Sequence, residues 1–222
     1  NINLSKTPVR ELNAALHRLN PETNETLWTI ANPGGEHSIA AGVDADITIN
    51  IQGNAGYYCG GMNKQATIIV EGSAGQGVGE NMMSGLIHVK GDASQSAGAT
   101  GRGGRLIVEG NASARCGISM KGVDIVVGGS VGDYSAFMAQ AGRLLICGDA
   151  GDGLGDSLYE AVIYVRGRVK SLGADAHEEP MSAADHEAVE SLLAGAGLSH
   201  DPQSFRRVAS MRSLYHWNAD AN

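Results

Sequence analysis

The sequence predicts an all-β solenoid, a right-handed, single-stranded parallel β-helix of about seven 19-residue coils with short helical N- and C-terminal extensions. The first observation is a glycine ladder with an unvarying interval of nineteen residues, formed by Gly53, Gly72, Gly91, Gly110, Gly129, Gly148 and Gly167. The second is a pair of aliphatic residues that stands two and four residues before each ladder glycine. Self-similarity at a period near twenty residues marks a repeat architecture.

Each repeat is expected to hold one strand and no helix. The apolar residues at minus four and minus two, counted from the ladder glycine, alternate with other residue types, which is the period of a strand with one buried face. Nineteen residues are too few for a βαβ unit, which needs about 30. Further glycines near plus seven and plus thirteen can serve corners where φ is positive or backbones crowd. Seven coils about 4.8 Å apart make a solenoid roughly 30 Å long, in which each coil packs only against its neighbours.

Composition excludes several classes of function. The chain has 222 residues, of which 32 are glycine, and this suits tight coils filled with small and β-branched side chains. A net charge of -8 argues against nucleic acid or an anionic membrane as a partner. No run of about 18 apolar residues is present, and residues 1–20 lack the apolar centre of a signal peptide, so we expect a cytoplasmic protein without a membrane span.

The pattern divides the chain into three parts: an N-terminal helix and cap in residues 1–46, a β-helix in 47–173 and a helical C-terminal tail in 174–222. Thr7 and Pro8 are typical of a helix start, and helical spacing follows through residues 8–19. Residues 26–46 are expected to cover the open end of the first coil, as a stacked solenoid requires.

The C-terminal part is expected to hold two short helices. Ser182 can cap the first together with Asp185, and an apolar stripe then runs to the glycines at 195 and 197. Asp201-Pro202 resembles a second helix start, followed by apolar residues at helical spacing. The aromatic end of this segment, Tyr215-His216-Trp217, is expected to be docked rather than free.

One outward position of the coils is unusually apolar. The residue at minus three lies on the strand face opposite to the residues at minus four and minus two, and among the seven repeats only Asn50 and His88 are polar at this position. The candidate interface row consists of Ile69, Ile107, Val126, Leu145 and Tyr164. A solvated face does not normally carry so long an aliphatic row. Either the chain's own terminal segment or another subunit is expected to cover it.

The three cysteines do not form a disulfide framework. Cys59 and Cys116 occupy plus six, where other coils place small or aliphatic residues, so both are expected in the core. Cys147 occupies minus one, where other coils carry polar residues. We therefore expect Cys147 to face solvent or a partner and to be the reactive thiol.

No constellation of catalytic, cofactor-binding or metal-binding residues emerges. The glycines of the run 75–79 repeat with the coil, so a phosphate-binding loop is not favoured. No two histidines have the spacing of metal ligands. His88 alone lies well inside the coils, and its outward position favours a surface histidine over a catalytic one. The coils are predicted to be scaffold.

The residues 53–56 and 79–85 resemble the GXGXG domain, which forms the C-terminal β-helix of the glutamate synthase large subunit and the C subunit of formylmethanofuran dehydrogenase. This resemblance covers about residues 47–170. The segments 7–13, 56–66 and 116–124 look most like the B-subunit family of methylamine-glutamate N-methyltransferase, also called N-methylglutamate synthase. That second resemblance spans nearly the whole chain and includes the tail 205–217.

The resemblance implies a hetero-oligomeric enzyme of three subunits. An amidotransferase-like subunit would handle the amine, and a glutamate-synthase-like subunit would carry FMN and an iron-sulfur cluster. Together they would convert methylamine and L-glutamate to N-methyl-L-glutamate and ammonia. This chain would bind no cofactor and would act as a rigid spacer that receives its partners on its outer surface.

Two alternatives remain open. The chain could be the β-helix subunit of a complex of the glutamate synthase or formylmethanofuran dehydrogenase type. A stand-alone β-helix acyltransferase is less favoured, because its period is eighteen residues and His88 is the sole candidate for its catalytic histidine.

Overall fold

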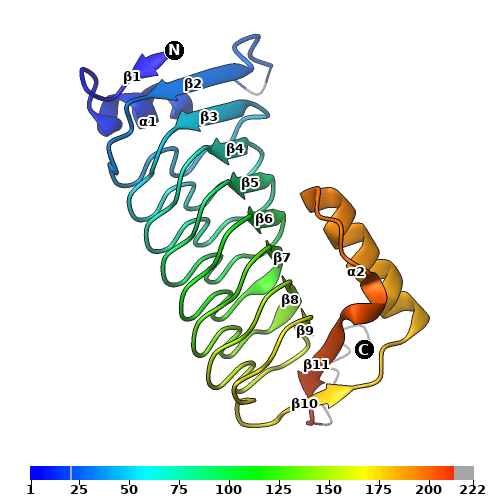
Figure 1. Ribbon diagram of the computed structural model, residues 1–222. Coiled ribbons are helices and arrows are strands. Elements are labelled where there is room, and N and C mark those ends of the chain that lie inside the picture. Colours follow the sequence, from blue (N-terminus) through cyan, green and yellow to red (C-terminus); the bar gives the residue numbers. More distant parts are fainter. Residues whose placement is uncertain (21, 213–222) are drawn as a thin grey trace, which may run out of the picture.

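A computed structural model describes residues 1–20 and 22–212 and has the form of a parallel β-solenoid of about seven turns (Figure 1). The ladder strands are β2 (Leu27–Ala31), β3 (Thr48–Gln52), β4 (Thr67–Val70), β5 (Leu86–Val89), β6 (Arg105–Val108), β7 (Lys121–Val127), β8 (Ala141–Ile146) and β9 (Val162–Val165). From β3 to β9 all neighbours pair in parallel, and Ile49 lies opposite Ile68 as Ile68 lies opposite Ile87. The predicted fold class is confirmed.

The predicted inward rows form the core. All seven residues at minus four and all seven at minus two have an exposed fraction of 0%. The residues at plus two pair from coil to coil in isolated bridges such as Ala55 with Ala74 and Ala74 with Ala93. Because identical positions stack on one another, small and β-branched side chains fill the interior without a helix to cover it.

The glycine ladder is required by crowding rather than by backbone angle. Only Gly53, at the start of the ladder, has a positive φ. At Gly110, an added Cβ would approach Asp92 Oδ1 and Gly91 O of the preceding coil to within 3.0 Å, and the later ladder glycines meet the same kind of obstacle. The Asp92 side chain occupies this space because its Oδ1 accepts a hydrogen bond of 2.7 Å from the backbone N–H of Asn111.

This hydrogen bond repeats as a polar ladder at plus one. The donor is always the backbone N–H of the plus-one residue in the next coil, and the acceptors are Asn54, Ser73, Asp92, Asn111, Ser130 and Asp149. Each bond spans nineteen residues. The corner glycines behave as predicted, since Gly60 at plus seven and Gly85 at plus thirteen have φ of 64° and 79°.

The N-terminal end is closed by α1 (Val9–His17), whose Leu12 and Leu16 are buried. The predicted start differs slightly: Pro8 itself takes the N-cap position, and no side chain caps the helix. β2 pairs with β3 at an offset of 21 residues, and β1 (Ile2–Asn3) pairs with β2. This larger offset explains why β2 does not share the nineteen-residue pattern.

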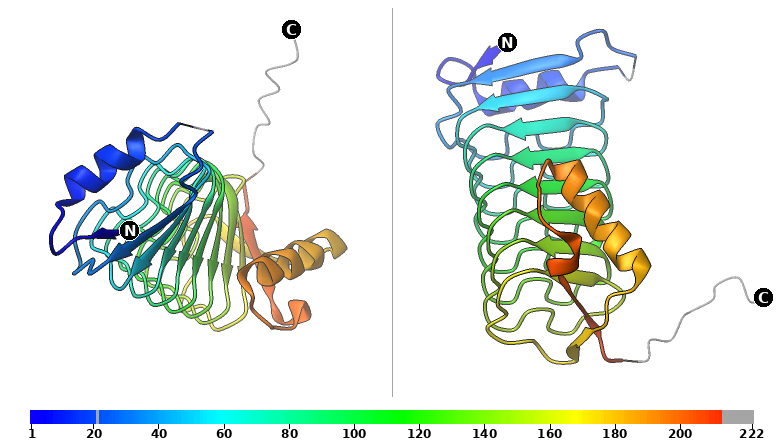
Figure 2. Two further views of the ribbon diagram at one scale, coloured as in Figure 1. Left: turned by 90° about the horizontal axis from the view of Figure 1, so that it is seen from above. Right: turned by 45° about the vertical axis from the view of Figure 1, so that its right-hand side comes forward.

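The C-terminal part folds back over the sheet. After β10 (Ala176–Glu179), α2 (Ala183–Ala196) rises across the outside of the last strands, as both views of Figure 2 show. The predicted second helix is wrong: Pro202–Ser204 forms only a short 3-10 helix, and β11 (Arg206–Ser210) follows. β11 pairs antiparallel with β9 and with β10, so the open edge of the last coil imposes a strand. The aromatic residues 215–217 lie outside the described residues.

None of the helices within residues 1–20 and 22–212 has both the length and the hydropathy of a membrane span.

Candidate subunit interface

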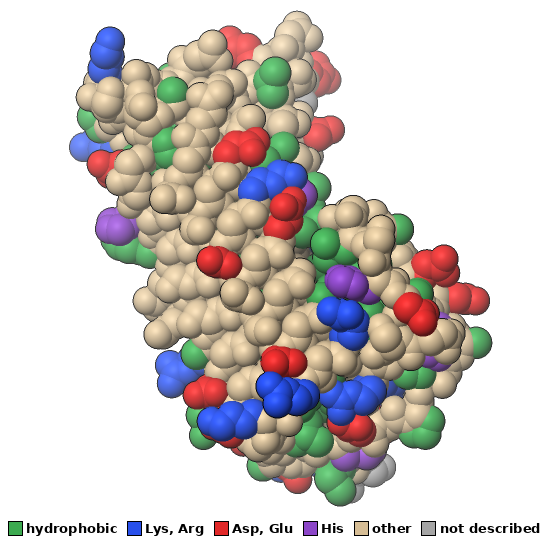
Figure 3. Space-filling model, in the orientation of Figure 1, with side chains coloured by type: hydrophobic (Ala, Val, Ile, Leu, Met, Phe, Trp, Pro, Cys, Tyr) green, Lys and Arg blue, Asp and Glu red, His purple; other side chains and the backbone are tan. Residues whose placement is uncertain are grey.

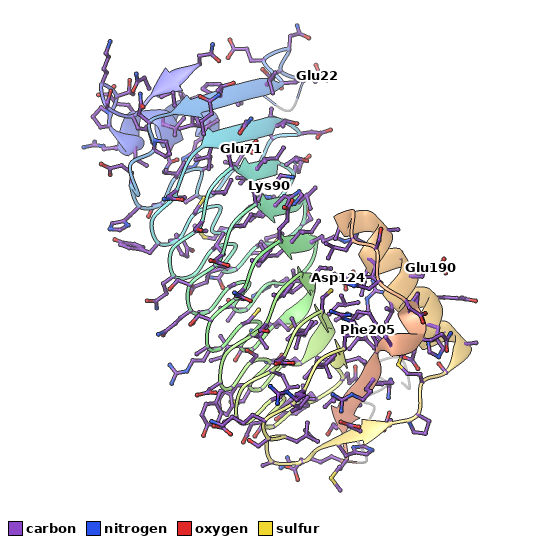
Figure 4. The ribbon with its side chains drawn as sticks, in the orientation of Figure 1. Glu22, Glu71, Lys90, Asp124, Glu190 and Phe205 are labelled. Carbon is purple, nitrogen blue, oxygen red and sulfur yellow. The ribbon has the colours of Figure 1, made fainter. Side chains whose placement is uncertain are left out.

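The C-terminal segment of this chain covers most of the candidate interface row. Ile107, Val126, Leu145 and Tyr164 have exposed fractions of 0–3%. They form one apolar cluster with Val189, Leu192, Leu193, Ala196 and Phe205. Of the two expected covers, the structure therefore shows the chain's own segment, and these four side chains are not free to contact another subunit. Figure 4 marks Phe205 at this contact.

The sequence dictates this packing locally. Ser182 and Asp185 form the predicted capping box, and Gly197 ends α2 in the left-handed conformation with φ of 69°. Val189, Leu192, Leu193 and Ala196 follow at i, i+3, i+4 and i+7, which places them on one helix face. Burying each large side chain contributes about 1.5–3 kcal/mol, so the row and the helix stripe stabilise each other.

A polar network holds the start of α2 to the sheet. The Tyr164 hydroxyl donates to Asp185 Oδ1 at 2.7 Å, and Arg207 Nε donates to the same oxygen at 3.1 Å. Arg207 also pairs with Glu179 of β10. Burial acts to raise the pKa of Asp185, but hydrogen bonds from Ser182 and Tyr164 outweigh it and hold that pKa below its usual value. Burial and the neighbouring Asp185 raise the pKa of Tyr164 to about 12.

Acid is therefore expected to loosen α2. The pKa of Asp185 is lower in the folded chain than in the unfolded chain, so its stabilising contribution is present above the unfolded value of about 3.9 and is lost as the pH falls through the folded value. We expect backbone amides of residues 183–196 to exchange faster at pH 3 than at pH 7 after correction for intrinsic rates. In Asp185→Asn this pH dependence should shrink. An unchanged dependence in the variant would show that other carboxylates carry the effect.

Three charged residues, Arg105, Asp124 and Arg143, lie in the neighbouring outward row at minus five. Arg143 binds Asp124 with two hydrogen bonds, of 2.8 Å from Nε and 2.6 Å from Nη2, and this contact raises the pKa of Arg143. Arg105, one coil before Asp124, is half-buried and has no hydrogen bond or ion pair with any residue in 1–20 and 22–212. Its guanidinium lies against Gly195 in the last turn of α2.

The row remains open beyond the end of α2. Ile69 on β4 and His88 on β5 are half-buried, and Asn50 on β3 is half-buried beside them. His88 Nε2 lies 2.8 Å from Glu109 Oε1, and Lys90 donates to the same oxygen at 2.9 Å. Asn50 Oδ1 is buried, and none of the described residues donates a hydrogen bond to it. His88 thus faces outward, as predicted, in an ion-pair cluster.

Cys147 does not face solvent or a partner, so the sequence-based expectation for this residue is wrong. It is 1% exposed and belongs to the cluster under α2, because α2 covers the part of the outer face on which it lies. Burial raises its pKa to about 11, although Arg166 opposes the shift. Cys59 and Cys116 are core residues, as predicted, and burial raises the pKa of each to about 12. Cys147 is therefore not a reactive surface thiol.

The native protein is expected to be inert to thiol reagents. At pH 8 a thiol with a pKa of about 11 is ionised in about one molecule in a thousand, and the thiolate is the reacting form. A chromogenic disulfide reagent should therefore detect no thiol within minutes in the folded chain and three in urea. Rapid release of one equivalent from the folded chain would show that α2 opens readily over Cys147.

The glycine run 75–79, considered above as a phosphate-binding loop, has a structural role. Gly75, Gly77 and Gly79 donate their backbone N–H groups to neighbouring coils at 2.9–3.0 Å, so these groups are not available for a phosphate. Within residues 1–20 and 22–212 no group of three His, Cys, Asp or Glu side chains is arranged to hold a metal ion.

Comparison with known proteins gives one full-length relative. No family model matches the chain. The chain is 52% identical over 220 residues to Protein GlxC of Rhizobium meliloti (strain 1021), and the alignment covers 99% of this chain and 96% of that protein. Such identity over the whole length includes the coils, both ends and the segment that folds over the sheet.

Proposed function

Because this chain belongs to the same protein family as Protein GlxC, we propose that it is the scaffold subunit of a glutamate-synthase-like enzyme. The reaction we propose for the complex is the conversion of methylamine and L-glutamate to N-methyl-L-glutamate and ammonia. The partners are an amidotransferase-like subunit and a glutamate-synthase-like subunit that carries FMN and an iron-sulfur cluster. The chain itself spaces and orients these two subunits and takes no part in the chemistry.

The observation that carries this proposal is the regular register of the coils. From β3 to β9 every neighbouring strand is offset by nineteen residues, with one irregularity, at the beginning of the β7–β8 pairing. The inward rows, the glycine ladder and the polar ladder are all used in stacking one coil on the next. Seven coils at about 4.8 Å make a stiff body roughly 30 Å long, which suits a spacer between two active sites.

The specific reaction rests on the sequence resemblance in residues 7–13, 56–66 and 116–124. In the structure the segment 56–66 belongs to coil corners, where Tyr57 and Met62 are exposed. Tyr57 stacks on His37 with ring centroids 3.8 Å apart. These corners lie away from the face that α2 covers, so a partner could contact them without displacing the C-terminal segment.

The test is reconstitution. The chain is expressed with the products of its neighbouring genes, affinity-purified through this chain, and the complex is assayed for methylamine-dependent N-methylglutamate formation. We expect two larger chains to copurify and activity to require all three. Full activity of the two partners without this chain would refute the scaffold role. Glutamine-dependent glutamate formation in place of the methylamine reaction would support the glutamate synthase alternative.

A further inference from the structure

We propose that the open part of the outer sheet face docks a helix of a partner subunit, which presents apolar side chains and one carboxylate that pairs with Arg105. We call this area the N-terminal face and define it by Asn50, Ile69, Leu86, His88 and Arg105. The identity of the partner as a subunit of the complex rests on the proposed function. The location and chemistry of the surface rest on the contacts of Arg105 and Leu86 and on the open end of the minus-three row.

Continuity with α2 indicates the kind of element that binds. α2 covers the minus-three row over the later strands and reaches β6 with Gly195, against which Arg105 packs. The same row continues as His88, Ile69 and Asn50, all half-buried and without a covering helix in the described residues. Leu86 is also only partly buried, although it packs against the same apolar cluster. A second helix lying end to end with α2 would therefore meet the same kind of surface.

The dimensions of the N-terminal face fit one helix. Four strands, β3 to β6, about 4.8 Å apart and four to five residues long offer an area of roughly 19 by 16 Å. An α-helix with its side chains is about 10–12 Å in diameter, and three turns span about 16 Å. The face is smaller than the roughly 800 Å² that each partner of a stable interface buries, so the helix is one element of a larger contact.

Charge identifies the polar group of the partner. Leu86, Arg105, Asp124 and Gly195 line an open hollow of about 480 Å³ at the end of α2. Figure 3 shows the hollow between the early coils and the C-terminal part that contains α2, with hydrophobic side chains exposed in it. Asp124 is neutralised by Arg143, whereas Arg105 has no anionic partner in the described residues. The hollow therefore carries one uncompensated positive charge, and a carboxylate is the group that a guanidinium binds with two hydrogen bonds.

A second copy of this chain does not fit as the occupant. The apolar faces of both of its helices are already buried, through Leu12 and Leu16 in α1 and through Val189 and Leu192 in α2. No other α-helix occurs in residues 1–20 and 22–212. Neither described helix is therefore free to dock, and we assign the docking helix to a different chain.

Binding of the purified partners to the intact chain tests the charge pairing. Arg105→Glu is expected to weaken binding at least ten-fold, because it places two carboxylates in contact. Arg102→Glu makes the same charge change at an exposed position on another side of the coil and should alter binding less than two-fold. Both variants should keep the circular dichroism spectrum of the parent, although Arg105→Glu lowers stability somewhat because it places a carboxylate beside Asp124 on the adjacent strand. Equal binding by the parent and Arg105→Glu would overturn the inference.

Photo-crosslinking identifies the occupant. A benzoylphenylalanine in place of Leu86 should crosslink to a helical segment of one partner that contains an acidic residue. A crosslink to another copy of this chain, or to a partner segment without helix or acid, would overturn the inference while the proposed function stands. If no partner associates with the parent chain at all, the proposed function fails and the inference fails with it.

Discussion

Replacing Gly110 by alanine is expected to destabilise the solenoid by about 3 kcal/mol, in the upper range for an overpacked site. The added Cβ would lie within 3.0 Å of both Asp92 Oδ1 and Gly91 O. Neither can retreat easily, since Gly91 O accepts a hydrogen bond from Gly110 N–H at 3.0 Å and Asp92 Oδ1 accepts one from Asn111 N–H at 2.7 Å. Urea unfolding followed by circular dichroism measures the loss.

Gly197→Ala is the matched control for this variant. Gly197 has φ of 69° but no atom within 4 Å of an added Cβ, so only the left-handed backbone is penalised, by about 1 kcal/mol. The double variant Asp92→Ala/Gly110→Ala should recover part of the loss, because the clash with Gly91 O remains. Equal losses at Gly110 and Gly197 would contradict the crowding explanation.

Replacing Leu145 by aspartate is expected to release α2 from the sheet, with a loss of about 4 kcal/mol or more. Leu145 is fully buried among Val126, Tyr164 and the α2 stripe. An unpaired charge in an apolar contact is among the few single changes that cost this much. Amide hydrogen exchange should show residues 183–196 losing protection while β3 to β5 keep theirs.

Ile69→Asp provides the comparison on the same row. Ile69 is half-buried and lies beyond α2, so its loss of stability should be much smaller in the isolated chain. Comparable losses in the two variants would show that the row is covered along its whole length. If Leu145→Asp left the isolated chain fully stable, the cover seen over Leu145 would have to come from another subunit.

The sequence predicts the coils well because their physics is local and repeated. A nineteen-residue period with aliphatic residues at minus four and minus two leaves one way to bury these residues in every repeat, which is to stack equivalent positions of successive coils on one another. The capping box of Ser182 and Asp185 is equally local and is confirmed. Such signals need no knowledge of distant parts of the chain.

The sequence-based predictions fail where a segment distant in the chain determines the surroundings of a residue. Phe205, Val208 and Met211 have helical spacing, yet β11 forms because β9 offers an unpaired edge. Cys147 occupies a position that is polar in other coils, yet it is buried because α2 crosses the sheet at that coil. Neither the strand edge nor the crossing is visible in the spacing of residues.

The solenoid, its period, its inward rows and its capped C-terminal helix follow from the sequence alone. The position of α2 does not: its cover over Ile107, Val126, Leu145 and Tyr164, which ends at Arg105 and leaves Ile69 open, is known only from the three-dimensional packing. An apolar outward row requires a cover, but the hydrophobic effect has no direction and does not specify which segment supplies it. The choice depends on where the last coil releases the chain and on which strand edges remain unpaired there.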